Sequence, residues 1–347
     1  METKSEEKLS VTELLKLAAK LLFGNINLLL FLCLCSLPLF CFLIFFELSL
    51  QTTVSLTSQF LFKLLTLGED LPENDLILIS EKKNDMIPWL IQTFLLYFFP
   101  YTILDLLTTT TIVAASSIVY TSKEEPLGLL YLVGRSVKIC QNRLGGCLIT
   151  SLYVLLWSTS VFLFLFLFFF LQFLSGSTNY LSIPYLSREY KRFHYQAAGL
   201  FDVVVVLTLL IQCTLFIVLT AKFSKWSSGW NMGLVVSVLE EDEDGQGIYG
   251  GDALSLSAWY RKGHEKRDLW LMLMFLVFGL AMRMPCLYSK CSASSSGNGV
   301  MYTGFYVGLI CVGNVLKWVT CLACYHDCKT MVLRKKRDVE HAKTLAA

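Results

Sequence analysis

Six long apolar stretches constrain this chain more than any other feature of its sequence. A helix needs about 20 mostly apolar residues to cross the hydrocarbon core of a membrane. The stretches that meet this requirement are Ile26–Leu48, Trp89–Val119, Cys147–Leu174, Ala198–Phe223, Leu269–Tyr288 and Met301–Tyr325. Charged residues make up only 16% of the 347 residues, against roughly 25% in soluble domains. The sequence therefore predicts an all-α fold, a polytopic membrane bundle of six transmembrane helices, with a tilt or a kink at Pro100 in the second.

Basic residues are concentrated on one side of the predicted membrane. The N-terminal segment, the connections after the second and fourth spans, and the C-terminal tail hold 19 Lys and Arg residues, whereas the three opposite loops hold seven. Because cytoplasmic loops carry the excess of Lys and Arg, both termini are predicted to be cytoplasmic. No cleavable signal peptide is evident in residues 1–25. We therefore expect an uncleaved multi-pass protein of the endoplasmic reticulum or the plasma membrane.

The chain is predicted to form a single membrane domain with a threefold internal repeat. Its parts are an amphipathic N-terminal segment at 1–25, the six-helix bundle at 26–325 and a basic tail at 326–347. The first, third and fifth spans begin near residues 26, 147 and 269 and are each preceded by a similar cytoplasmic segment. The three segments are Leu9–Phe23, Pro126–Leu144 and Asp252–Arg267. Each repeat unit would be an amphipathic helix, a span out, an external loop and a span back.

These cytoplasmic segments have the pattern of interfacial amphipathic helices. In the first, Leu14, Leu17 and Leu21 fall at helical spacing, and Ser10 with Glu13 fits a capping box. Such helices place their apolar side toward the acyl chains and their basic groups toward anionic headgroups. The alternative is that the segments are simple connectors with a polar rim.

The connection between the fourth and fifth spans carries a family resemblance. It contains Trp226 and Trp230, then the run Val235–Glu240, a Gly-rich stretch, and Ser257 to Gly263. This pattern resembles a signature of an uncharacterised family of plant multi-pass membrane proteins. The six-span layout is also loosely similar to the membrane domain of some bacterial glycerophosphodiester phosphodiesterases. The resemblance implies no activity or site residues, and Gly245 to Gly251 are interpreted as a turn.

Two pairs of charged residues lie within the predicted spans. Asp105 and Lys317 each lie 16 residues after the external end of an inward-running span, so both are expected about 24 Å from that end. Glu47 and Arg283 form a second candidate pair near the external ends of their spans. Buried ions of this kind face the bundle interior or a water-filled cavity. They are interpreted either as a substrate or proton pathway or as structural bridges.

The twelve Cys residues do not indicate a disulfide scaffold, because most fall in or near spans. Cys286 and Cys291 lie at the predicted external end of the fifth span and are a candidate disulfide. At the cytoplasmic end of the last span, Cys321, Cys324 and Cys328 are candidates for palmitoylation beside a basic run. The alternative for these three is ordinary packing at a helix end.

The sequence favours two classes of function, neither of them enzymatic. It contains no nucleophile elbow and no His-rich metal motif, so no catalytic residue, cofactor or metal is expected. One hypothesis is a non-catalytic membrane organiser or adaptor of the secretory pathway. The other is a small-molecule or ion transporter with a polar path at Asp105 and Lys317. The expected partners are the lipid bilayer, anionic headgroups, and another membrane protein or a second copy, with no nucleic acid.

Overall fold

The structure, a computed structural model, describes residues 9–66, 87–122, 128–181, 194–242, 245–288 and 297–346. Its elements are α1 (Val11–Gly24), α2 (Ile26–Thr66), η1 (Tyr97–Tyr101), α4 (Thr102–Thr121), α5 (Leu129–Leu181), α7 (His194–Leu239), α8 (Gly250–Tyr260), α9 (Glu265–Tyr288) and α10 (Gly297–Ala346). By length and composition, the helices suited to crossing a membrane in this part of the chain are Ile26–Thr57, Ile87–Thr121, Leu129–Val161 and Val300–His341. The predicted all-α architecture is therefore confirmed, with four helices of membrane-crossing character.

Several helices continue well past the predicted ends of the spans. Helix α2 runs for 41 residues to Thr66. Helix α7 includes the Trp226 motif and ends at Leu239, and α10 continues through the basic tail to Ala346. Hydropathy marks only the part of a helix that suits lipid, and these polar extensions contain no Pro that would end a helix. The predicted loop after the first span and the predicted C-terminal tail are thus helical in their described parts.

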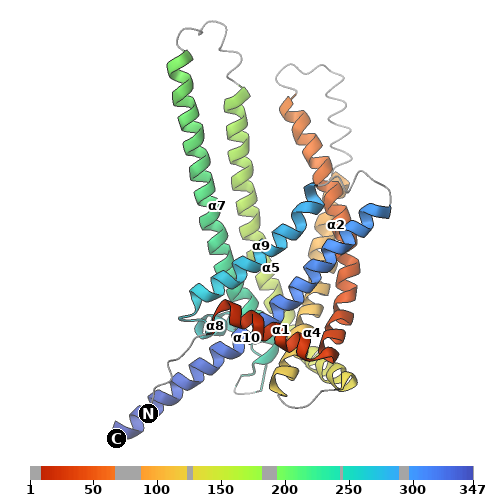
Figure 1. Cartoon of the computed structure of the whole chain (residues 1–347), viewed down its shortest axis with the longest axis vertical. Helices are drawn as coiled ribbons and strands as arrows, with labels where there is room; N and C mark the ends of the chain where they lie inside the picture. The colour runs from red at the N-terminus through yellow and green to blue at the C-terminus, as the bar shows by residue number, and fades with distance from the viewer. Residues whose placement is uncertain are drawn as a thin grey trace.

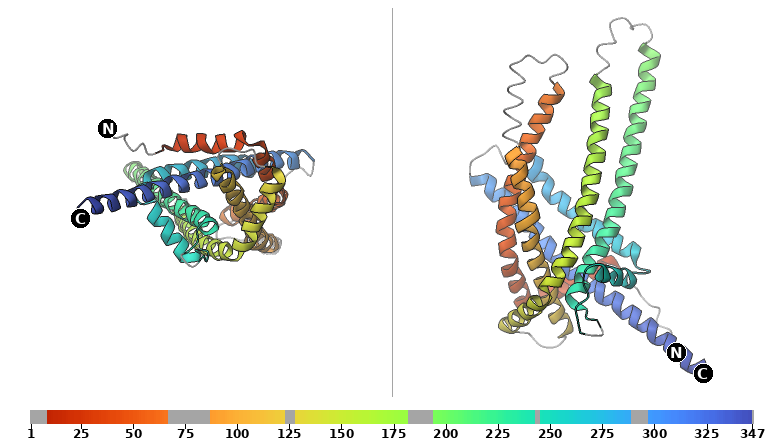
Figure 2. Two further views of the ribbon diagram at one scale, coloured as in Figure 1. Left: turned by 90° about the horizontal axis from the view of Figure 1, so that it is seen from below. Right: turned by 180° about the vertical axis from the view of Figure 1, so that it is seen from behind.

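The helices form an upright group crossed by an oblique pair. Helices α2, α4, α5 and α7 run roughly along the long axis of the molecule, whereas α9 and α10 cross it at an angle (Figure 1). Helices α1 and α8 lie at one end (Figure 2). We call this the α1/α8 end.

Most of the buried apolar side chains belong to a core at the α1/α8 end, which includes Leu14, Val235 and Leu322. A smaller apolar cluster joins α2 to α10 through Leu39 and Val307. The molecule is therefore packed most continuously at the α1/α8 end, and the second cluster lies between α2 and the oblique α10.

The capping box predicted at the start of α1 is confirmed. The Ser10 hydroxyl accepts from the Glu13 amide at 3.3 Å, and the Glu13 carboxylate accepts from the Ser10 amide at 2.6 Å. The apolar stripe of α1 was expected to face lipid, but Leu14, Ala18 and Leu22 are buried in the protein. Helix α10 supplies the largest part of the surface against which α1 packs.

The other two amphipathic segments differ from the expected isolated helices. Residues 129–144 are the first turns of α5 and continue directly into its apolar part. Figure 2 shows these turns lying across the α1/α8 end before the helix rises along the long axis. The third segment is divided, because α8 ends at Tyr260 and α9 begins at Glu265. Gly263, with φ of 93°, makes the turn between them, a conformation that favours glycine.

The Gly-rich stretch before α8 forms the predicted turn. Gly245 and Gly250 have φ of 73° and 61°. Glu241 and Gly247 pair in a short antiparallel bridge across the turn. The chain thereby reverses and starts α8 alongside the end of α7, as the turn interpretation of this stretch required.

Candidate ligand cavity between α2, α4, α9 and α10

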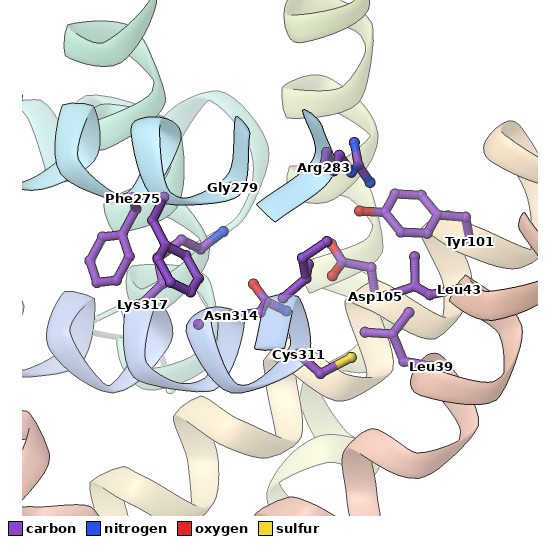
Figure 3. A pocket seen from close by; sticks show the side chains of 13 residues that line it. Leu39, Leu43, Tyr101, Asp105, Phe275, Gly279, Arg283, Cys311, Asn314 and Lys317 are labelled. Atoms are coloured by element: carbon purple, nitrogen blue, oxygen red, sulfur yellow. The ribbon is translucent and has the colours of Figure 1, made fainter. Parts of the chain in front are cut away.

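A cavity of about 170 Å³ lies where α2 and α4 meet the oblique pair α9 and α10. It is lined by Leu39, Leu43, Tyr101, Asp105, Phe275, Phe278, Gly279, Arg283, Ile310, Cys311, Gly313, Asn314 and Lys317. Its polar side chains come from η1, α4, α9 and α10, and Figure 3 shows them converging on one space. A water molecule occupies roughly 30 Å³ of liquid, so the cavity has room for several waters or one small solute.

A π-helical segment places the first of these polar groups. Pro100 has no amide hydrogen to donate within a helix, and η1 spans Tyr97–Tyr101 around this residue. Tyr101 stacks on Phe46 of α2 with ring centroids 5.9 Å apart. Its hydroxyl points into the cavity (Figure 3). The predicted irregularity at Pro100 is therefore a π-helical turn.

Helix α10 supplies the opposite wall of the cavity. Cys311, Asn314 and Lys317 follow one another at intervals of three residues and so share one helix face. Gly313 lets α9 approach, since a Cβ atom at this position would lie 2.4 Å from the Phe278 ring. The close contact of α9 with α10 therefore depends on a residue without a side chain.

Asp105 and Lys317 line this same cavity without bridging one another directly. Among the ion pairs between described residues, none within 4.0 Å includes either side chain. The Lys317 amine lies 4.4 Å from the centre of the Trp318 ring. The Asn314 amide faces the Asp105 carboxylate (Figure 3). The cavity therefore holds one carboxylate and one amine that are separate and open to the same space.

Glu47 and Arg283 are brought together at the edge of this region. The Arg283 Nε atom lies 3.9 Å from Glu47 Oε2, and the Glu47 side chain is 3% exposed. The second carboxylate oxygen of Glu47 and the amide of Gln51, one turn later on α2, are buried without a hydrogen-bond partner among the described residues. Buried polar atoms of this kind are usually satisfied by water. Buried polar side chains therefore extend from the edge of the cavity along α2.

Sequence reasoning missed Tyr101 and Gln51. Tyr101 lies four residues before Asp105, and Gln51 lies four residues after Glu47. Each therefore falls on the same helix face as a residue that was singled out. The spacing was the signal that would have identified both.

The candidate cysteines have different outcomes. Cys291 and the side chain of Cys286 lie outside the described residues. Cys321, Cys324 and Cys328 are all buried, at 5% exposure or less. An acyl donor has no access to thiols in this position, so palmitoylation would require α10 to separate from its neighbours. Cys324 and Cys328 each accept a hydrogen bond from Arg267 Nη2 at 3.2 Å.

A second group of charges, at the α1/α8 end, was not anticipated. We call Arg261, Arg267, Asp268 and Asp327 the end cluster. Asp268 accepts from Arg261 Nε at 3.0 Å and lies 3.4 Å from Arg267 Nε. Arg267 also reaches Asp327 at 2.5 Å. These contacts tie the α8–α9 turn to α9 and α10 through charges that are almost completely buried.

Glu240 joins three further elements at the same end. Its Oε1 atom accepts from Lys329 Nζ at 2.6 Å, from the Tyr260 hydroxyl at 3.2 Å and from the Tyr325 hydroxyl. Burial alone would raise the pKa of Glu240, but the hydrogen bonds from Lys329 and Tyr325 outweigh it and lower the pKa below its ordinary value. Tyr260 thus has a polar partner in Glu240.

Comparison with protein-family models, with curated proteins and with solved structures finds no match to this chain. What the chain does is therefore inferred from its own residues and their geometry.

Proposed function

We propose that this chain is a multi-pass membrane transporter that binds a small polar solute inside its helical bundle. The observation that carries the proposal is the cavity between α2, α4, α9 and α10, which holds Asp105 and Lys317 as separate charges. Keeping a charged side chain inside a helical bundle, away from water, costs free energy unless the charge is paired or binds a ligand. A closed structural bridge would have left no space between them.

The proposal includes six spans with both termini in the cytoplasm. Helices α7 and α9 would add the fourth and fifth spans to the four with membrane-crossing character. Three units are supported by the similar starts of α2, α5 and α9, each preceded by a short helix or a bend at the α1/α8 end (Figure 2). The cavity is lined from α2, η1, α4, α9 and α10, so it draws on the first and third units.

Uptake into proteoliposomes tests the proposal. Four labelled solutes that do not cross bilayers unaided would be used: alanine, succinate, choline and glucose. The purified protein is expected to accelerate the uptake of at least one of them. Lys317→Met should reduce that uptake by about tenfold or more, since loss of one charged contact of this kind exceeds about 1.4 kcal/mol.

Lys222→Met is the matched control for this experiment. Lys222 is exposed on α7, away from the cavity lining, so its loss removes the same charge elsewhere. Equal uptake by protein-free liposomes and by proteoliposomes for all four solutes would contradict a transport function.

A membrane organiser is the second candidate, and the last part of α10 favours it. This part of the helix extends past the bundle (Figure 1). Arg334, Lys335, Lys336 and Arg337 are all exposed there. Basic groups beside a bilayer attract anionic headgroups by about 1 kcal/mol each. The exposed side chains of Phe23 and Ile26, at 76% and 70%, add apolar surface near the same end.

Native mass spectrometry tests the organiser function. The protein would be released from vesicles that contain phosphatidylserine and phosphatidylcholine, and the bound lipids would be counted. Replacing the four basic residues with Gln should abolish the excess of phosphatidylserine. An unchanged lipid ratio would remove the support for this function and leave the cavity proposal untouched.

A further inference from the structure

The charges around the cavity show which class of solute it fits. Arg283 has its counter-charge in Glu47, whose carboxylate oxygen lies 3.9 Å away. This leaves Asp105 and Lys317 as one negative and one positive group facing the same space. The sum of these charges is zero, yet neither Asp105 nor Lys317 is bridged directly to an opposite charge among the described residues.

The two groups also lie on different walls. Asp105 belongs to α4 and Lys317 to α10, and Figure 3 shows Asn314 between them. A molecule that reaches from one to the other would pass the Asn314 amide, which can both donate and accept a hydrogen bond. The arrangement is therefore a site with a cation-binding end, a neutral polar middle and an anion-binding end.

We infer that the solute is a small zwitterion, with its ammonium group at Asp105 and its carboxylate at Lys317. A free cation would gain attraction at Asp105 but meet repulsion from Lys317, and a free anion would meet the reverse. A zwitterion compensates both buried charges and adds no net charge to the membrane interior. This inference rests on the proposed transport function and specifies its substrate class.

The size of the cavity limits the zwitterion further. The cavity measures about 170 Å³, which is room for one small molecule. Since a cavity of about 150 Å³ takes one benzene ring, this volume suits the smallest α-amino acids, with five or six non-hydrogen atoms, and does not hold an ammonium and a carboxylate group together with an aromatic side chain. Leu39, Leu43 and Phe275 line the apolar part and suit a methyl group in preference to a further polar one.

Ligand binding to the intact protein in detergent tests the inference without any mutation. The midpoint of thermal unfolding would be measured with alanine, propionate, ethylamine and phenylalanine at equal concentrations. Propionate lacks the ammonium group of alanine, ethylamine lacks its carboxylate, and phenylalanine keeps both but is larger. Because a ligand that binds only the folded protein stabilises it, alanine alone should raise the midpoint.

Two variants assign the ends of the site. Asp105→Asn should weaken alanine binding by about tenfold or more and bring propionate binding up to or above that of alanine. Lys317→Met should weaken alanine binding to a similar extent. Asp252→Asn and Lys222→Met, which remove exposed charges outside the cavity, should bind alanine as the unmodified protein does.

The outcomes separate this inference from the function on which it rests. Binding of propionate or ethylamine as tight as that of alanine, or uptake of succinate, choline or glucose without alanine, would overturn the zwitterion and leave transport standing. Absence of uptake for every solute would overturn the transport function itself. Alanine binding that survives in both cavity variants would show that alanine binds elsewhere and would also overturn the inference.

Discussion

Two groups of buried charge in this molecule differ in whether the charges touch. In the end cluster, Asp268 contacts Arg261 at 3.0 Å and Arg267 at 3.4 Å. The space beside Asp268 amounts to about 10 Å³, which is the lower limit for one water. In the cavity, Asp105 and Lys317 line a space of about 170 Å³ without contacting one another directly. Residue types of the same kind therefore serve as a clamp in one place and as an open site in the other.

The contrast teaches that burial of charge does not by itself identify function. A direct, hydrogen-bonded ion pair offsets part of the desolvation cost of its charges, and removing one partner leaves the other charge buried and unpaired. Separate charges around a cavity have no direct counter-charge until a ligand enters. The two groups are expected to respond to mutation in opposite ways: the end cluster through stability, and the cavity through binding.

The largest effect is expected from Asp268→Asn. The variant keeps the size of the side chain but leaves Arg261 and Arg267 without the carboxylate that they share. Removing one partner of a buried ion pair costs about 3–5 kcal/mol, so the free energy of unfolding should fall by this amount. Thermal or denaturant unfolding in detergent measures it.

Glu265→Gln is the matched control for this variant. The ion pair of Glu265 with Lys225 is about half exposed on both sides, and such surface pairs contribute about 0–1 kcal/mol. If Asp268→Asn were as stable as Glu265→Gln, the end cluster would not be a clamp.

An intermediate, pH-dependent effect is expected from Glu240→Gln. Glu240 accepts three hydrogen bonds, and loss of its charge should cost about 1–3 kcal/mol at neutral pH. Because its pKa is lower in the folded protein than the ordinary 4.5, the stabilisation is fully present above about pH 4.5 and is lost as the pH falls through the lowered pKa. The variant and the unmodified protein should therefore converge in acid. A difference that stays constant from pH 7 to pH 3 would exclude titration of Glu240 as its source.

The end cluster and the cavity were not equally predictable from the sequence. Helical periodicity and a rise of 1.5 Å per residue are local rules, and they singled out Asp105 and Lys317, which the structure places around one cavity. The contact of Arg267 with Asp327 joins residues 60 positions apart. No local spacing encodes such a contact, because it depends on how α9 crosses α10.

The width of the cavity could not be predicted from the sequence either, because it also depends on how the helices cross. Gly313 reads as an ordinary residue of an apolar helix, yet it sets the approach of Phe278 on α9. Hydropathy likewise identifies only the part of a helix that suits lipid. It therefore did not predict that α2 and α7 extend beyond that part. Local sequence patterns were enough to predict the individual helices. Which polar groups meet depends on how the helices cross in the tertiary structure.

The smallest effect on stability is expected from Asp105→Asn and Lys317→Met, and it is the most informative. Neither side chain is bridged to an opposite charge among the described residues, so neutralising one leaves no opposite charge stranded and removes a desolvation cost. This gain offsets the lost contact of Lys317 with the Trp318 ring or of Asp105 with Asn314, and the free energy of unfolding without ligand should change by less than about 1 kcal/mol. The unfolding measurement used for Asp268→Asn checks this, with Asp252→Asn and Lys222→Met as controls. A loss as large as that of Asp268→Asn would mean that Asp105 and Lys317 hold the bundle together through water, and the distinction between clamp and open site would fail.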